Sequence, residues 1–284
     1  MKTRLLFLVV VIYCCSSEDI NTSHELPSCL LLEISLDNES GDEAKSLFWY
    51  DSLGRLTRIF YTSLEKVHFQ RKMDTIDFSW QDNNVTSVKK YHHESNDEGL
   101  NYSANIEFQI EYDDKIITNV HEFLSGYPEN GTIYKFMYGN KSEILRVTVS
   151  VDGINTYEIS NEYDLAGNIK ETTTSYSYGI EKITFEYDNE FNYKSIITKS
   201  LGGQEALTFL FDRWQWARRG NISRNNMTRE FVNFTSHNYG PENYEYNYEL
   251  TYNKSQLPTE IIGTYRSTFE NKGAPITILY TNCN

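Results

Sequence analysis

Segments in which apolar and polar residues alternate recur along most of the chain, and polar turns separate them. The clearest copy runs from Phe48 to Ile59 and contains an aromatic strand end, the turn Asp51–Gly54 and a second alternating segment. Alternation with period two places one side of a strand on a core, and Asp, Asn and Gly at the centre suit the geometry of a tight turn. Each copy therefore predicts a β-hairpin.

One aromatic residue directly before the turn marks each of eight copies of this unit. These anchor aromatics are Tyr50, Trp80, Tyr112, Tyr138, Tyr163, Tyr187, Phe211 and Tyr252. Since about 25 residues accommodate two strands and two connections, eight copies predict roughly sixteen strands. A single hairpin cannot bury its apolar face, and wide sheets curl or close. The predicted fold is all-β, a large antiparallel up-and-down meander curved into a barrel or half-barrel, with a long loop in the interval Trp216–Tyr244.

The amino terminus has the parts of an export signal in their usual order. Lys2 and Arg4 precede the apolar run Leu5–Tyr13. As a helix this run spans about 14 Å, against roughly 30 Å for the core of a bilayer. The segment therefore predicts a cleaved signal peptide rather than a membrane span.

Two adjacent cysteines, Cys14 and Cys15, follow this apolar run. The region resembles a bacterial lipobox, in which the cysteine after the cleavage point is acylated, and the preceding Ile12 and Cys14 make Cys15 the predicted lipidation site. We expect a lipoprotein signal peptide over residues 1–14, a flexible tether over 15–28 and a single β-meander domain over 29–284. An ordinary secretory signal, which would leave the protein secreted, is the alternative.

Apart from these two residues, the chain has only Cys29 and Cys283, one at each end of the predicted domain. In an oxidising compartment they can form a disulfide that closes the domain, and two separate thiols are the alternative. No two cysteines are separated by two residues, so the sequence predicts neither a structural zinc site nor a thioredoxin-like motif.

The composition favours strands, and the net charge and the motifs limit the classes of function to consider. Aromatic residues make up 14% of the chain, with 22 Tyr, and such residues favour strands. The net charge of −14 disfavours nucleic acid, whose phosphates need clustered cations. The chain has no nucleophile elbow, zinc-protease motif or glycine-rich phosphate loop, so we expect a protein that is not an enzyme, with no catalytic residues, metal or cofactor. His92, His93 and Glu94 are expected in a solvated polar loop.

Two aromatic stripes are the candidate ligand surface. Trp214 and Trp216 are two residues apart, hence on one face of a strand, and Tyr244 and Tyr246 form a similar stripe. Exposed stripes of this kind stack on sugar rings, whereas buried stripes fill a barrel interior. We favour the interior for both pairs.

The repeated units resemble the YD repeats of bacterial surface proteins, with the best match from Tyr50 to Leu56. The chain is also similar to a family of Bacteroidota lipoproteins, the domain of unknown function 4595, described as porin-like. The shared features are the lipoprotein signal, the length, these turns and the terminal segment from Tyr252 to Ile261. The resemblance implies a porin-like shape, and the family offers no catalytic residues to assign.

These observations favour a non-enzymatic protein, lipid-anchored at the outer membrane and facing the cell surface, that binds a ligand or a partner. The expected partners are the membrane, through the amino-terminal lipid, and a glycan or a surface protein. Two alternatives remain open: a structural or adhesive surface protein, and a hydrolase whose site no motif reveals.

Overall fold

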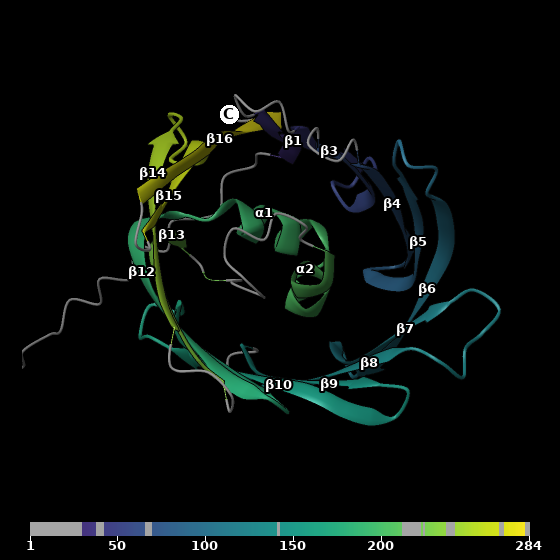
Figure 1. Cartoon of the computed structure of the whole chain (residues 1–284). Coiled ribbons are helices and arrows are strands. Elements are labelled where there is room, and N and C mark those ends of the chain that lie inside the picture. The colour runs from purple at the N-terminus through teal and green to yellow at the C-terminus, as the bar shows by residue number, and fades with distance from the viewer. Residues whose placement is uncertain are drawn as a thin grey trace, which may run out of the picture.

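The structure, a computed structural model, describes residues 30–37, 43–65, 70–140, 143–211, 223, 225–236, 242–266 and 270–281. Across these residues, sixteen strands each pair antiparallel with their neighbours in sequence, and β1 pairs with β16, so the sheet closes into a barrel (Figure 1). The predicted all-β up-and-down meander is confirmed, and the barrel is a closed one.

The bounds of the strands follow in chain order. They are β1 Leu30–Asp37, β2 Glu43–Tyr50, β3 Leu56–Glu65, β4 Gln70–Gln81, β5 Asn84–Ser95, β6 Asn101–Asp113, β7 Ile116–Leu124, β8 Thr132–Tyr138, β9 Ile144–Val151, β10 Ile154–Tyr163, β11 Ile169–Tyr176, β12 Gly179–Phe191, β13 Asn225–Ser236, β14 Glu242–Tyr252, β15 Pro258–Arg266 and β16 Glu270–Thr281. The calls on Cys14, Cys15, Cys29, Cys283, Trp214 and Trp216 lie outside the described residues.

The alternation in the sequence separates the inside of the barrel from its outer surface. Along β12, the buried residues Glu181, Ile183 and Phe185 alternate with the exposed residues Lys182 and Thr184. Successive side chains of a strand point to opposite faces, so the wall has an inner and an outer set of side chains.

The outer set carries ion pairs between neighbouring strands at several places around the barrel. They are Lys45–Glu33 at 2.8 Å, Arg58–Asp77, Arg146–Glu158 at 3.5 Å, Lys182–Glu171 at 2.9 Å, Arg229–Glu186 at 3.0 Å and Arg229–Glu245 at 3.0 Å. Exposed pairs of this kind contribute little to stability, but they mark the outer wall as charged.

Six of the eight anchor aromatics, together with Tyr280, form a ring at one rim of the barrel. Each of these seven residues lies at or near the end of an even-numbered strand and donates a hydrogen bond to a backbone carbonyl at the start of the preceding strand. The pairs are Tyr50–Leu31 at 2.7 Å, Trp80–Leu56 at 2.8 Å, Tyr112–Val85 at 2.9 Å, Tyr138–Ile117 at 2.7 Å, Tyr163–Ile144 at 3.0 Å, Tyr187–Ile169 at 2.7 Å and Tyr280–Pro258 at 2.8 Å. The sequence repeat is therefore a repeated tertiary contact.

The polar turns at the same rim follow from their Asp and Gly residues. In the first turn, Asp51 Oδ1 accepts bonds from the backbone N–H groups of Leu53 and Arg55, at 2.9 and 3.0 Å. Gly54 has a φ of +76°, a conformation that costs glycine little. Asp164 and Asn253 accept equivalent bonds in later turns, so one turn geometry recurs along the rim.

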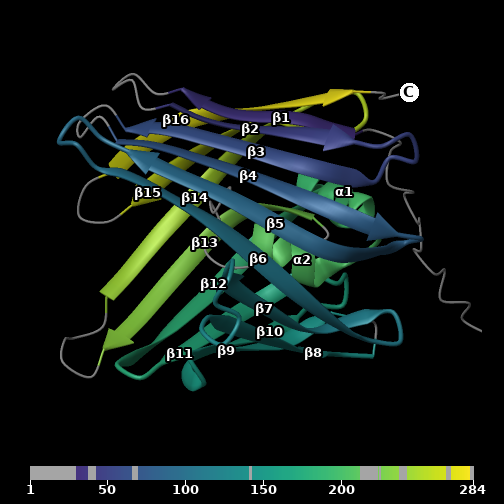
Figure 2. The same cartoon turned by 90° about the vertical axis from the view of Figure 1, so that its right-hand side faces the viewer.

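Two helices interrupt the meander between β12 and β13. They are α1, Tyr193–Ser200, and α2, Glu205–Phe211. Because they replace a turn of the anchor rim, the chain enters the barrel there, and both helices lie inside it (Figures 1 and 2). Among the described helices, none is long and apolar enough to cross a membrane.

The position of Phe211 corrects one prediction. The sequence placed it at the end of a strand, as an anchor, but it ends α2 and lies inside the barrel. Its ring packs edge-on against Phe78, at 5.3 Å between centroids, and against Phe108, at 4.9 Å. The alternation around it spans too few residues to distinguish a strand from a short buried helix.

The interval Trp216–Tyr244, in which the sequence predicts a long loop, consists mostly of strand where the structure describes it. Strand β13 occupies residues Asn225 to Ser236 of that interval, and β14 begins at Glu242. Residues 216–222 of the interval lie outside the described residues, so a loop there stays a prediction; the connection from β12 to β13 also contains the two helices, which the sequence did not predict.

Tyr138→Phe should lower the free energy of unfolding by about 1–2 kcal/mol, because it removes the hydroxyl that donates to the carbonyl of Ile117 and keeps the ring. Tyr163→Phe is the matched control, since the carbonyl of Ile144 also accepts a bond from Asn161 Nδ2 at 2.9 Å and keeps that donor. Tyr163→Phe should lower the free energy of unfolding clearly less than Tyr138→Phe does. Urea unfolding of both variants makes the measurement, and equal losses would contradict the assignment of the Tyr138 effect to the carbonyl of Ile117.

Candidate functional site

A cavity of about 510 Å³ opens at the anchor rim, between the β2–β3 turn, the β4–β5 turn and the end of α1. Its volume is typical of a small-molecule site. The lining residues are Leu30, Leu53, Gly54, Arg55, Trp80, Asn83, Ile196, Lys199, Ser200 and Gly202. We call it the rim pocket.

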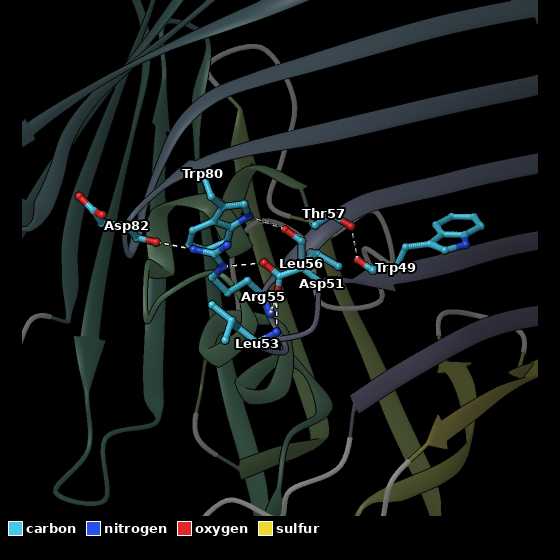
Figure 3. Close-up of polar contacts among 8 residues, drawn as sticks. All are labelled: Trp49, Asp51, Leu53, Arg55, Leu56, Thr57, Trp80 and Asp82. Carbon is cyan, nitrogen blue, oxygen red and sulfur yellow. Dashed lines mark hydrogen bonds and ion pairs between the residues drawn. The ribbon is translucent and has the colours of Figure 1, made fainter.

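Arg55 and Trp80 form the rigid wall of the rim pocket (Figure 3). The Arg55 guanidinium carbon lies 5.2 Å from the centroid of the Trp80 ring, within the range of a cation–π contact. Arg55 Nε lies 2.7 Å from Asp51 Oδ2, and Nη1 donates to the carbonyl of Asp82. These bonds hold the cation in place over the indole.

The Asp51 carboxylate is the fixed partner of this arginine. Burial acts to raise the pKa of Asp51, but hydrogen bonds from Arg55 and Leu53 and the positive charge of Arg55 outweigh it and lower that pKa. The carboxylate therefore stays ionised at neutral pH and positions the guanidinium.

The indole of Trp80 is fixed at its other end. Its Nε1 donates to the carbonyl of Leu56 at 2.8 Å, the bond that the tyrosines of the ring make through their hydroxyls. Trp80 is the only described member of the ring that is a tryptophan, and its side chain is half-buried. The larger ring extends the wall of the pocket.

The end of α1 closes the opposite side. Gly202 has a φ of +70°, and a Cβ atom there would lie 2.9 Å from the carbonyl oxygen of Asn83 and 3.5 Å from the Trp80 ring. Only glycine permits so close an approach. Lys199, in the last turn of α1, is exposed and brings a second cation to the pocket.

The rim pocket thus combines an aromatic ring, two cations and apolar side chains in a protein whose net charge is −14. Rings of this kind bind apolar faces of ligands, and the cations favour a negative group. This arrangement is suited to binding an anionic ligand with an apolar face.

Helix α1 lines the pocket, and the helix that follows it, α2, is bonded to the rim at its start. Gln204 Nε2 donates to the carbonyl of Lys115 at 2.9 Å, in the β6–β7 turn. The Glu205 carboxylate accepts a bond from the backbone N–H of Ile144, at the start of β9. Its Oε2 atom is buried and has no hydrogen-bond partner among the described residues.

Glu205 faces a second carboxylate, Glu143, and the ring tyrosines Tyr138 and Tyr163. Burial, and then the negative charge of Glu143, raise the pKa of Glu205 to about 7. Burial likewise raises the pKa values of both tyrosines, which stay neutral. The start of α2 is therefore sensitive to the ionisation of one carboxyl group.

Of the residues singled out as a candidate ligand surface, the structure describes Tyr244 and Tyr246, and neither lines the rim pocket. Tyr244 and Tyr246 lie on β14, half-buried, and pack against a small apolar cluster that includes Ile183, Phe185 and Val232. Arg55 and Lys199 were not singled out from the sequence. The one feature of the sequence that could have indicated this pocket is Trp80, a tryptophan at an anchor position where most copies of the repeat have tyrosine.

The histidines near residue 92 lie in strand β5 and not in the predicted loop. His92 Nδ1 is 2.6 Å from Asp74 Oδ1 on the inner face, whereas His93 Nδ1 is 2.9 Å from Ser103 Oγ. The prediction was wrong because the inner face of the barrel is polar at this place, so this part of the strand has a composition typical of a loop. Among the described residues, no group of His, Cys, Asp and Glu is arranged to hold a metal ion.

No protein-family model and no curated protein matches the chain. Among solved structures, it is similar to a porin-like protein from Bacteroides uniformis, with 15% identity, 90% of this chain and 98% of that chain covered, and a TM-score of 0.57. A porin-like protein from Bacteroides vulgatus has 12% identity, coverage of 89% and 99%, and a TM-score of 0.42. The first of these similarities shows that the chain has a porin-like barrel fold.

The pKa of Glu205 predicts a pH dependence of stability. Because the folded state raises this pKa from its ordinary 4.5 to about 7, the unfolded state ionises first as the pH rises. The free energy of unfolding should therefore fall between about pH 4.5 and 7, by on the order of 2 kcal/mol.

Chemical denaturation of the wild type and Glu205→Gln at pH 5 and pH 8 tests this dependence. The variant should lose most of the difference between the two pH values, and Glu129→Gln, at an exposed glutamate, should retain it. A Glu205→Gln profile that parallels the wild type would show that another group is responsible.

Proposed function

We propose that this protein is a non-enzymatic, lipid-anchored surface protein that binds an acidic oligosaccharide in the rim pocket. The observation that carries the proposal is the fixed Arg55–Trp80 pair with Lys199 opposite. The faces of sugar rings are apolar and suit an indole, and a uronic-acid carboxylate suits the two cations. The lining residues include no acid–base pair, which favours binding over catalysis.

The charged outer wall supports anchoring through a lipid. A barrel that spans a membrane presents an apolar band outward, whereas ion pairs such as Lys182–Glu171 and Arg229–Glu245 lie on the outer face of this wall. We propose that the barrel stands in water, is held at the outer membrane by acylation of Cys15, and belongs with the Bacteroidota lipoproteins that its turns resemble. A structural or adhesive role is the second candidate, and self-association without a ligand would favour it.

Tetragalacturonate should bind the wild-type protein, and Lys199→Ala should weaken that binding about fivefold or more, because an exposed cation of the pocket is lost. Lys170→Ala is the matched control, an exposed lysine at the start of β11, outside the pocket, and should bind as the wild type does. Titration calorimetry at low and high salt makes the measurement. An absence of binding at millimolar ligand, or equal affinities of the two variants, would contradict the proposal.

The proposed acylation of Cys15 has a separate test. Radiolabelled palmitate should enter the wild-type protein and Cys14→Ala in a bacterial host, and should be absent from Cys15→Ala, because only the cysteine after the cleavage point is acylated. The protein should then fractionate with membranes in the first two cases alone. Label in Cys15→Ala would refute the assignment.

A further inference from the structure

A second cavity, of about 420 Å³, lies at the end of the barrel opposite the anchor rim, where β7 ends and the β7–β8 connection begins. Its volume, like that of the rim pocket, is typical of a small-molecule site. Ile106 on β6 and Glu122 and Leu124 on β7 line it from the wall of the barrel. Tyr127 and Asn130 line it from the connection. We call this cavity the far pocket.

The β7–β8 connection is packed closely on the wall. A Cβ atom at Gly131, which also lines the far pocket, would lie 2.2 Å from the carbonyl oxygen of Glu122, so only glycine permits this approach. The backbone N–H of Gly131 donates to Asp152 Oδ1 at 3.0 Å, and the N–H of Asp152 donates to the carbonyl of Gly131 at 3.0 Å. The N–H of Tyr127 donates to the carbonyl of Leu124 at 2.9 Å. The connection is therefore held at both ends.

The Glu122 carboxylate is the one charged side chain among the described residues that line the far pocket. It is half-buried, and its Oε2 atom accepts a hydrogen bond from the Tyr134 hydroxyl at 3.0 Å. Among the described residues, no cation forms an ion pair with Glu122. Lys90, which lies opposite Ile106 in the sheet, is directed to Asp74, with 3.8 Å between Nζ and Oδ1. The pocket therefore has a negative wall.

The other side chains of the far pocket offer apolar and aromatic surface. Ile106 is half-buried, Leu124 is 48% exposed and Tyr127 is 59% exposed. No ring contact among the described residues includes Tyr127, so no other aromatic ring covers its faces. An uncovered aromatic face attracts a cation. The ring of Tyr127 can therefore contact a positive group that enters the pocket.

The charge of the wall decides which class of ligand fits. A neutral apolar ligand would remove water from the Glu122 carboxylate without giving it a partner, which costs free energy, and an anion would be repelled. A metal ion needs several ligating groups, and no group of His, Cys, Asp and Glu among the described residues is arranged to hold one. An ammonium group can donate to the carboxylate and contact an aromatic ring, and an apolar chain attached to it can contact Ile106 and Leu124.

We propose that the far pocket binds a small organic cation, an ammonium group carried on an apolar chain. Glu122 accepts its hydrogen bonds and balances its charge, the Tyr127 ring contacts the cation, and Ile106 and Leu124 contact the chain. This ligand is opposite in charge to the ligand of the rim pocket and binds at the other end of the barrel. The proposal therefore does not rest on the function proposed for the rim pocket.

The test uses the whole protein and three probes of equal chain length, hexylamine, 1-hexanol and hexanoate, in titration calorimetry at pH 7, where the amine is protonated. Hexylammonium should bind, and the other two probes should bind at least about tenfold more weakly. Glu122→Gln should weaken the binding of hexylammonium about tenfold, because the amide keeps an acceptor for Tyr134 and loses the charge. Glu129→Gln is the matched control, an exposed glutamate of the same connection that does not line the pocket, and should bind as the wild type does.

Tyr127 gives a second, independent comparison. Tyr127→Ala should weaken the binding of hexylammonium about threefold or more, and Tyr127→Phe, which keeps the aromatic face, should retain it. Because Tyr127 is exposed, its truncation should leave the unfolding midpoint unchanged, which a circular dichroism melt checks. Lys199→Ala, in the rim pocket, should bind hexylammonium as the wild type does.

Three results would overturn the proposal. They are the failure of hexylammonium to bind at millimolar concentration, equal affinities of the wild type for hexylammonium and 1-hexanol, and equal affinities of Glu122→Gln and Glu129→Gln for hexylammonium. If Glu122→Gln does not fold, the preference of the wild type for the cation and the two Tyr127 variants decide the question.

Discussion

The barrel depends on one repeated contact, an aromatic donor held against a backbone carbonyl at one rim. In an antiparallel meander, a slip of two residues keeps every apolar side chain on the inner face, so alternation alone specifies register incompletely. A bond from Tyr50 to the carbonyl of Leu31, or from Tyr138 to that of Ile117, is lost by such a slip. The ring of anchors therefore selects one register for each of the seven strand pairs that it joins, and through them favours the closure between β1 and β16.

The candidate site arises where this regular pattern is broken. Tyr252 donates to the Asp188 carboxylate and not to a carbonyl of the preceding strand, and the chain after Asp188 leaves the wall to form the two internal helices. The end of α1 then meets two ordinary turns of the rim and completes the rim pocket beside Trp80. A pocket with this shape requires both the regular turns and the single interruption.

The sequence predicts the wall well because alternation and turn residues report directly on local geometry. It fails at Phe211, where three residues of alternation fit a short helix equally well, and it misses Tyr280, which no polar turn follows before the chain ends. The rim pocket is harder still to predict from the sequence. Arg55 and Trp80 are 25 residues apart, and Lys199 is far from both in the chain. They come together because the barrel closes and because two helices, which the alternation did not predict, lie inside it.

The indole N–H signal of Trp80, observed by ¹⁵N nuclear magnetic resonance and assigned by its loss in Trp80→Phe, tests this account most directly. The account predicts slow hydrogen exchange at this group, because it donates to the carbonyl of Leu56, and a shift of its signal when tetragalacturonate is added. The signal of Trp49, which is 43% exposed on the outer wall, should exchange quickly and stay unchanged. Fast exchange at Trp80, or a ligand that shifts only the Trp49 signal, would contradict it.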